Sequence, residues 1–166
     1  GKINSIDVAS GKATNIPFTA HIHQTITDAV RFAQEVAPDS FDVKMLRWVT
    51  VSPDQKHVVY TSLGKLYVKD LPDGKPHRVT NDPDNDELFP SWSTDSRTLT
   101  YASWNDYELG AIRTVGLDGK NAKKLTKKPG HYIEPKFSPN GDQVVFRRIG
   151  SDGLRNPLYT QDRGVY

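Results

Sequence analysis

Three stretches of the sequence repeat one pattern and decide the fold: WVTVSPDQKHVVYTS (48–62), SWSTDSRTLTYAS (91–103) and PKFSPNGDQVVFRR (135–148). In each, a short apolar run ends near a serine, a polar turn follows, and a second apolar run contains an aromatic residue. The serine recurs at Ser52, Ser93 and Ser138, at spacings of 41 and 45 residues. A repeat of this length built from short strands is typical of a β-propeller, in which each blade is a four-stranded antiparallel sheet.

The turns within each repeat suit tight reversals of the chain. Residues 52–55 read Ser-Pro-Asp-Gln and residues 138–141 read Ser-Pro-Asn-Gly; proline presets φ, and Asp, Asn and Gly tolerate the left-handed turn position. Asp-Gly pairs, a strong hairpin signal, follow at 73–74 and 118–119. The pattern therefore predicts an all-β meander, with first strands at 46–51, 89–92 and 134–137 and second strands at 57–61, 98–102 and 143–147.

The repeat divides residues 1–166 into five segments of one partial propeller. Residues 2–18 match residues 65–80, the second half of a repeat, so Asp7 aligns with Asp70. We expect two complete blades and two half-blades: an outer half-blade at 2–18, an insertion at 19–45, blades at 46–80 and 88–126, and an inner half-blade at 134–166, whose third strand would begin in 163–166.

A propeller needs about four to eight blades to close its ring. We therefore expect the remainder of a longer parent chain, or another copy, to complete it. The half-blades would otherwise expose unpaired edges, so strands 2–16 are expected to pair with strands near 134–148 of the same or another copy. Within the insertion, apolar residues alternate like a strand from Phe18 to Ile26, whereas residues 28–36 also fit a short helix that Thr27 would start.

Composition limits the classes of function. The chain has 36% hydrophobic and 25% charged residues and a formal net charge of +2, which indicates neither disorder nor a strong field for nucleic acid. The absence of cysteine excludes disulfides and thiolate metal sites. No apolar run approaches the ~18–20 residues that cross a bilayer, so we expect no membrane span.

Two groups of residues have the types and spacing of metal ligands. His21 and His23 would lie on one face of a strand and could share a metal, but the other histidines are scattered, so two exposed strand histidines are the favoured interpretation. Asp82, Asp84 and Asp86 have the spacing of calcium loops, yet Glu87 stands where such loops need glycine. A solvated loop is therefore favoured over a calcium site, and we expect no metal or cofactor.

The basic run between Lys120 and Lys128 spans a hairpin and an outer strand, and edge lysines ordinarily protect a sheet against aggregation. We favour that role over phosphate or nucleic-acid binding. The sequence contains no Gly-x-Ser-x-Gly elbow, phosphate loop or acid pair at a recognisable spacing. We therefore expect no catalytic residue within this chain.

The three repeats resemble the TolB-type, WD-like propeller blade, whose hallmark is a Pro, an aromatic, Ser-Pro-Asp-Gly, an apolar strand and a closing Leu-Thr. The resemblance covers residues 2–18 and 46–150. Gln55 and Ser96 stand where the blade usually has a turn glycine, and Thr94 replaces the proline.

A narrower resemblance rests on NIPFTAHIHQ (15–24), KMLRWVTVSPD (44–54) and SWND (103–106). These segments are similar to the N-terminal propeller of exported amidohydrolases, which implies a non-catalytic scaffold, shield or gate for a metal-dependent hydrolase domain outside this chain. The alternative is a protein-binding TolB-like propeller with no enzymatic role. Both imply a periplasmic or secreted protein.

The resemblance also implies that certain loops share one face of the propeller, namely 19–45, 81–87, 104–110, 128–132 and 151–156. Exposed aromatic residues on a rigid scaffold are typical anchors for a protein or peptide partner. The candidate contact residues are therefore Trp104, Asp106, Tyr107 and Tyr132. The alternative is that Trp104 and Tyr132 merely cover neighbouring loops.

Overall fold

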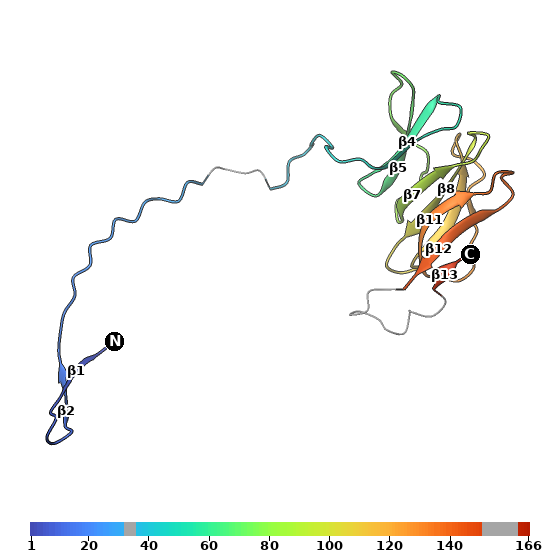
Figure 1. Ribbon diagram of the computed structural model, residues 1–166. Coiled ribbons are helices and arrows are strands. Elements are labelled where there is room, and N and C mark those ends of the chain that lie inside the picture. The colour runs from blue at the N-terminus through green and yellow to red at the C-terminus, as the bar shows by residue number, and fades with distance from the viewer. Residues whose placement is uncertain (32–35, 151–162) are drawn as a thin grey trace. The chain divides into compact units, whose positions relative to one another are not determined.

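The computed structural model describes residues 1–31, 36–150 and 163–166 and divides the chain into two units, residues 1–40 and 41–166 (Figure 1). In the smaller unit, β1 (Ile3–Ile6) and β2 (Ala13–Ile16) form an antiparallel hairpin in which Ile3 pairs with Ile16. The two strands pair with each other in a two-stranded sheet. Pairing of this hairpin with strands near 134–148 stays a prediction.

The strand predicted from the alternation after Phe18 is not formed. Residues 17–31 contain neither strand nor helix, and Ile22 and Ile26 are 84% and 85% exposed. Alternation gives a strand only where a neighbouring edge accepts its backbone hydrogen bonds and a core covers its apolar face. Of the helical alternative at 28–36, residues 28–31 and 36 are not helical, and residues 32–35 lie outside the described residues.

The larger unit consists of three antiparallel sheets in chain order (Figure 1). The first sheet contains β3 (Arg47–Val51), β4 (His57–Ser62), β5 (Lys65–Asp70) and β6 (His77–Arg78). The second contains β7 (Asp86–Trp92), β8 (Thr98–Trp104), β9 (Ala111–Gly116) and β10 (Lys123–Lys124). The third contains β11 (His131–Phe137), β12 (Val144–Ile149) and β13 (Gly164–Val165).

The described residues contain strands and no helix, which confirms the predicted fold class of four-stranded antiparallel sheets. In the third sheet, β13 pairs with β12 through Arg147 with Val165 and Arg148 with Gly164. A short third strand thus lies within 163–166. The predicted loop at 151–156 lies outside the described residues.

The repeated serine organises the turn between the first two strands of each sheet. Ser52 Oγ donates to Asp54 Oδ1 (2.6 Å) and accepts from the backbone N–H of His57 (2.9 Å). Ser93 makes the equivalent bonds to Asp95 and Thr98. Because one hydroxyl satisfies both sides of the turn, the serine recurs wherever the turn does. The matching serine of the third sheet is bonded to the residues that close its turn, Asp142 and Gln143.

The first strand of each sheet has a bulge that the sequence did not reveal. Trp48, Phe89 and Glu134 have φ of 51°, 54° and 54°, and each lies at a shift in the pairing register with the second strand. A bulge bends a strand and increases its local twist. Non-glycine residues with positive φ at the same point of all three repeats indicate a feature that the fold requires.

The core lies between successive sheets. Between the first and second sheets, Leu66, Val68, Leu99 and Val115 are fully buried, and Trp92 donates its indole N–H to the carbonyl of Thr50 (3.1 Å). Between the second and third sheets, a smaller cluster is formed by Ala102, Ile112 and Tyr132 with Leu88, Phe89, Val144 and Phe146 against them. Each sheet therefore depends on its neighbour for burial of its apolar face.

Candidate functional site

A pocket of about 440 Å³ lies at the edge of the second sheet where β7 begins and β8 ends. Asp86, the first residue of β7, pairs with Trp104, the last residue of β8. Antiparallel pairing therefore brings the loop before β7 and the loop after β8 to the same edge of the sheet. The lining residues are Asp84, Asp86, Trp104, Asn105, Asp106, Tyr107 and Glu108.

Two asparagines hold these loops together. Asn105 Oδ1 accepts from the backbone N–H groups of Tyr107 (2.9 Å) and Glu108 (2.6 Å), so its side chain closes the loop after β8. Its amide nitrogen donates to Oδ1 of the buried Asn85 at 2.8 Å. The SWND segment contains Asn105, whose role in closing the loop was not predicted from the sequence, although asparagine side chains commonly close local turns in this way.

The loop before β7 is organised by one carboxylate and one ammonium group. Asp82 accepts from the backbone N–H of Asp84 (3.0 Å) and from the backbone and side chain of Asn85 (3.1 and 2.9 Å). Burial raises the pKa of Asp82, but these hydrogen bonds outweigh it and hold the pKa below its usual value. The ammonium of Lys65 donates to the carbonyls of Asp82, Pro83 and Asn85 at 3.2, 2.9 and 2.7 Å.

Of the three aspartates whose spacing resembles a calcium loop, Asp82 has a structural role in this loop. The Asp82 carboxylate is engaged by its own loop, and Lys65 supplies the positive charge that the loop carbonyls bind. In the described part of the chain, no three His, Cys, Asp or Glu side chains are grouped so that they could hold a metal ion. His21 and His23 lie in a segment without regular structure, not on a strand.

Three of the four residues predicted for the interaction face come together at this pocket. The Trp104 indole N–H donates to Asp106 Oδ1 (3.1 Å), and its ring lies tilted against His131 of β11, with centroids 5.3 Å apart. Burial lowers the pKa of His131, so this imidazole is largely neutral at pH 7. Asp106 is exposed, and Tyr107 is 98% exposed. Trp104 therefore both packs on the next sheet and lines the pocket.

Tyr132 lies in the core instead. It is 6% exposed, its ring packs edge-on against Phe146 with centroids 5.4 Å apart, and its hydroxyl donates to the carbonyl of Lys128 (2.7 Å). This is the packing role that the sequence left open for Tyr132. Tyr132 is largely buried and lines a different pocket, with Leu125 and Phe146, so the candidate site is built without it.

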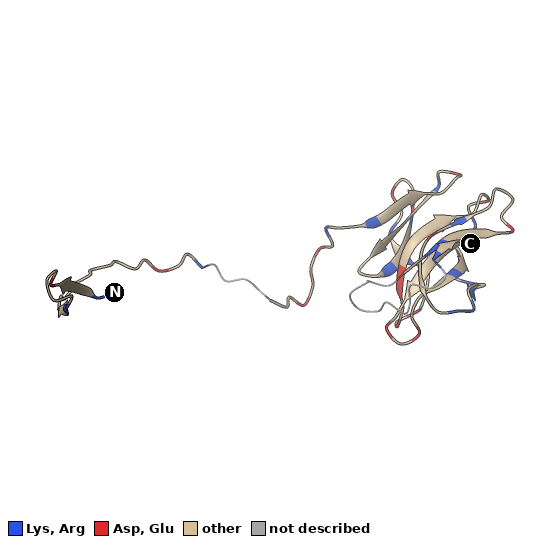
Figure 2. Cartoon of the chain, turned by 60° about the horizontal axis from the view of Figure 1, so that its bottom comes forward, with Lys and Arg blue, Asp and Glu red and all other residues tan. Residues whose placement is uncertain are grey.

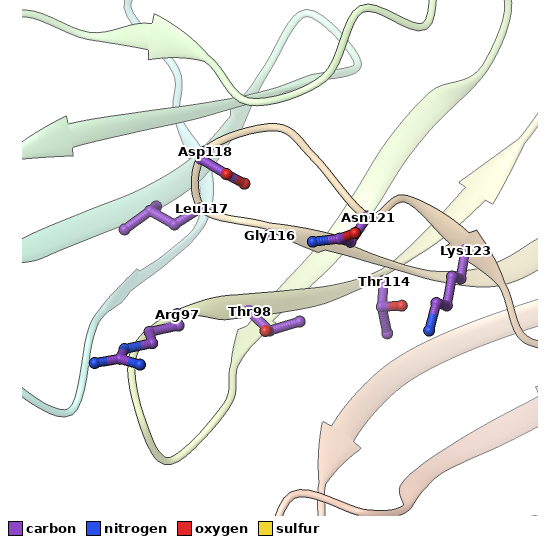
Figure 3. Close-up of a pocket in the computed structure, with 8 residues that line it drawn as sticks. All are labelled: Arg97, Thr98, Thr114, Gly116, Leu117, Asp118, Asn121 and Lys123. Carbon is purple, nitrogen blue, oxygen red and sulfur yellow. The ribbon is translucent and has the colours of Figure 1, made fainter.

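A second cavity, of about 490 Å³, lies at the opposite end of the second sheet. Its lining includes Arg97 and Lys123, which extend away from each other in Figure 3, together with the residues Thr98, Thr114, Gly116, Leu117, Asp118 and Asn121. These polar groups do not converge on one point. The charged lining residues are Arg97, Lys123 and Asp118, so both signs of charge are present at this end. Figure 2 shows that Lys and Arg as well as Asp and Glu occur across the larger unit.

Glu87 carries the most deeply buried carboxylate among the described residues, with 0% exposure. It accepts from the backbone N–H of Leu66 (2.7 Å) and from the hydroxyl of Thr80. Burial raises its pKa above the usual value, and these hydrogen bonds oppose the rise. Because β7 is joined in this way to the first sheet, Glu87 acts as a structural tie directly behind the pocket loop.

The fold and repeats define a class, the β-propeller with TolB-like blades, and comparisons with known proteins support it. No family model matches the chain. Tol-Pal system protein TolB of Francisella tularensis subsp. mediasiatica (strain FSC147) is 29% identical over 105 residues, 63% of this chain and 23% of that protein. TolB of F. tularensis subsp. holarctica (strain LVS) is 29% identical over 90 residues, 52% of this chain and 20% of that protein.

Solved structures agree on the fold. TolB from Acinetobacter baumannii superimposes with a TM-score of 0.54 at 18% identity, covering 73% of this chain and 31% of that one. The tricorn protease gives a TM-score of 0.53 at 16% identity, covering 89% of this chain and 13% of that one. The chain spans about a quarter of the length of the curated TolB relatives that it matches. These likenesses establish a TolB-like β-propeller fold and do not show the narrower amidohydrolase connection.

In the part of the chain that the structure describes, no helix is long and apolar enough to cross a membrane.

Proposed function

We propose that this chain is a protein-binding part of a TolB-like propeller, and that it captures a peptide segment of its partner in the pocket between the start of β7 and the loop after β8. The observation that carries this proposal is Tyr107, a ring 98% exposed on a loop that Asn105 holds in place. An aromatic side chain on a rigid loop loses little conformational entropy on binding, which makes it an effective anchor.

The TolB relatives support this proposal because they are proteins of the Tol-Pal system. Action in the periplasm, and completion of the propeller by the rest of a parent chain, are parts of the same proposal. So is the division of the chain into blades at 46–80 and 88–126 flanked by half-blades at 2–18 and 134–166. The TolB relatives lend no support to the hydrolase scaffold that the narrower resemblance implied.

Selection from a random peptide library tests the proposal. The full chain is used as bait, and selected peptides are measured by calorimetry against the wild type, Tyr107→Ala and Phe41→Ala. Phe41 is a matched control because it is also an exposed aromatic residue, 63% exposed, in the larger unit but away from the pocket lining. We expect affinity to fall about tenfold or more with Tyr107→Ala, the size of a typical anchor residue, and to stay unchanged with Phe41→Ala. Failure to select any peptide, or equal binding by Tyr107→Ala, would overturn the proposal.

A further inference from the structure

The turn between the first two strands of the third sheet differs chemically from its two equivalents. In the first two sheets, the second residue after the serine is an aspartate, Asp54 or Asp95. Its Oδ1 accepts from the serine hydroxyl (2.6 Å in both turns) and from the backbone N–H two residues further on (3.1 and 3.0 Å). In the third sheet that position is Asn140, and Ser138 Oγ donates instead to Asp142 Oδ1, at 3.0 Å. The third turn therefore lacks a carboxylate where the other two have one.

Asn140 is also the only asparagine in the sequence that is followed by glycine. The following residue matters because its backbone nitrogen can attack the side-chain amide carbon of asparagine, and a Cβ on that residue hinders the attack. Glycine has no Cβ and also gives the backbone the freedom to reach the reactive conformation. This chemistry is one reason why asparagine is a thermolabile residue.

The surroundings of Asn140 leave room for this reaction. Asn140, Gly141 and Asp142 are all exposed, and a Cβ added at Gly141 would meet nothing within 4 Å. Among the described residues, none forms a hydrogen bond with the Asn140 side chain. The amide group is therefore in contact with water and is not held away from the backbone that follows it.

One backbone hydrogen bond of the turn has to open for the reaction. The Gly141 N–H donates to the carbonyl of Ser138 at 3.0 Å, and this nitrogen is the reacting atom. The bond from Thr94 Oγ1 of the second sheet to the carbonyl of Pro139, at 3.1 Å, does not involve the reacting atoms. Exposed turns open locally at a much smaller free-energy cost than core strands do. The folded protein therefore reaches the reactive conformation without global unfolding.

We infer that Asn140 is a site of spontaneous deamidation, and that its aspartate product gives the third turn the carboxylate that the first two turns have. The Gly141 nitrogen forms a bond to Cγ of Asn140, the bond from Cγ to Nδ2 breaks, and ammonia leaves with the proton of the Gly141 nitrogen. Water then opens the cyclic imide at either of its carbonyl carbons, which yields aspartate or isoaspartate. The aspartate accepts from Ser138 Oγ as Asp54 accepts from Ser52, whereas isoaspartate adds a methylene group to the backbone and distorts the turn.

Incubation of the full chain at mildly alkaline pH, followed by proteolysis and mass spectrometry, tests the site. Asn121 is the matched control, because it is also exposed and has a positive φ of 56°, but it precedes Ala122. We expect the amide of Asn140 to be exchanged for an acid at least about tenfold faster than that of Asn121, a difference of about 1.4 kcal/mol in activation free energy. The change of mass separates this reaction from isomerisation at Asp-Gly pairs, which leaves the mass unchanged. Equal rates at Asn140 and Asn121 would overturn the inference.

The variant Gly141→Ala tests the reacting atom. It should slow the loss of ammonia at Asn140 by about tenfold or more, again about 1.4 kcal/mol, because the added Cβ hinders the attack even where the turn loosens. An unchanged rate would show that the Gly141 nitrogen does not attack Asn140, and would contradict the mechanism.

A second measurement tests the place of the aspartate product in the turn. The double variant Asn140→Asp/Asp142→Asn moves the carboxylate to the position that it has in the first two turns. Hydrogen bonds from serine hydroxyls lower the pKa of Asp54 and Asp95 below the usual value, so the pKa of the new carboxyl should be lowered in the same way when it is titrated by NMR. Asn121→Asp is the control, whose carboxyl should titrate in the usual range. The same pKa at both positions would refute the role of the product in the turn.

Discussion

The two joints of the second sheet are built differently, although the three sheets repeat one pattern. Its joint with the first sheet contains a fully apolar cluster and a buried polar tie, in which Glu87 bonds to Leu66 and Thr80. Its joint with the third sheet has the smaller cluster around Ala102, Ile112 and Tyr132, and Trp104 of β8 packs on His131 of β11. The hydrogen bonds of Glu87 fix the orientation of the second sheet against the first, because hydrogen bonds have a defined geometry. Apolar contacts alone tolerate small shifts between sheets. The pocket therefore lies next to the Glu87 tie to the first sheet and contacts the third sheet through Trp104.

The largest expected effect comes from opening the apolar cluster of the first joint. Leu66 is fully buried there, and Leu66→Ala should lower the free energy of unfolding by about 2–5 kcal/mol, because it leaves a cavity between two sheets. Leu125→Ala is the matched control, since Leu125 is 43% exposed. Urea denaturation followed by tryptophan fluorescence measures both. Equal loss in the two variants would show that the first joint does not carry the stability of the fold.

The polar tie is expected to matter somewhat less. Glu87→Ala should cost about 2–3 kcal/mol, because it leaves the Leu66 N–H and the Thr80 hydroxyl buried without a partner. Glu87→Gln keeps the volume and an acceptor, and should cost less. The comparison of the two variants by urea denaturation separates the lost hydrogen bonds from the lost charge. An Ala variant as stable as the Gln variant would contradict the role of Glu87 as a tie.

The charge of Glu87 also predicts a pH effect. Burial raises the folded-state pKa of the Glu87 carboxyl above its usual value of about 4.5, so the folded state binds its proton at higher pH than the unfolded state does. Stability from this group therefore rises as pH falls from the folded pKa towards about 4.5. Between pH 7 and 4.5 the wild type should gain stability relative to Glu87→Gln, which urea denaturation at several pH values measures. A constant difference between wild type and Glu87→Gln would refute the raised pKa.

A smaller effect is expected at the loop bond that joins the pocket to the polar joint. Asn105→Ala removes the bond to Asn85 and the two bonds that close the loop, and should cost about 1 kcal/mol because the site is partly solvated. Peptide binding should weaken further than the fold does, since Tyr107 loses its fixed position. Amide hydrogen exchange should show faster exchange at Tyr107 and Glu108. Unchanged exchange there would show that other contacts hold the loop.

The sequence predicted the fold well for a physical reason. Each blade is specified locally, by a serine that closes a turn and by apolar alternation that recurs with the same period, and neither needs knowledge of distant contacts. What it missed depends on packing between sheets. The residue types around Trp48, Phe89 and Glu134 do not indicate a positive φ at these positions, because the bulge follows from strand geometry.

The grouping of three candidate residues at one pocket could be predicted for the same reason, and their contact with a partner stays a prediction. Trp104, Asp106 and Tyr107 belong to one loop, so reading the loop as a unit was enough. The sequence left both roles of Tyr132 open, because its burial depends on packing against Phe146, which lies on another strand. Lys65 and Asn85 escaped notice because their roles arise only when two sheets meet. The alternation of apolar residues after Phe18 gave a wrong strand prediction, because a strand also needs a neighbouring strand edge with which its backbone can form hydrogen bonds.

The smallest effect concerns the turn that the three sheets share. Gln55, Ser96 and Gly141 occupy its left-handed position, with φ of 61°, 62° and 78°. Only the turn of the third sheet has glycine there, the residue that adopts this conformation without strain. Gln55→Gly should therefore stabilise the fold by about 0.5–1 kcal/mol, the relief of the left-handed conformation being partly offset by the entropy of glycine in the unfolded chain. Ser96 is a poorer choice, because its hydroxyl accepts from the backbone N–H of Asp54 in the neighbouring turn at 3.1 Å.

Gly141→Ala provides the reverse experiment. An added Cβ at Gly141 meets nothing within 4 Å, so any loss of stability comes from the backbone alone. If glycine stabilises this turn by adopting its left-handed conformation, Gln55→Gly should raise the melting temperature and Gly141→Ala should lower it by a similar amount in thermal denaturation. Two shifts of the same sign would mean that the turn responds to its neighbouring sheet, as Ser96 does, and that the blades are less independent than their repeat suggests.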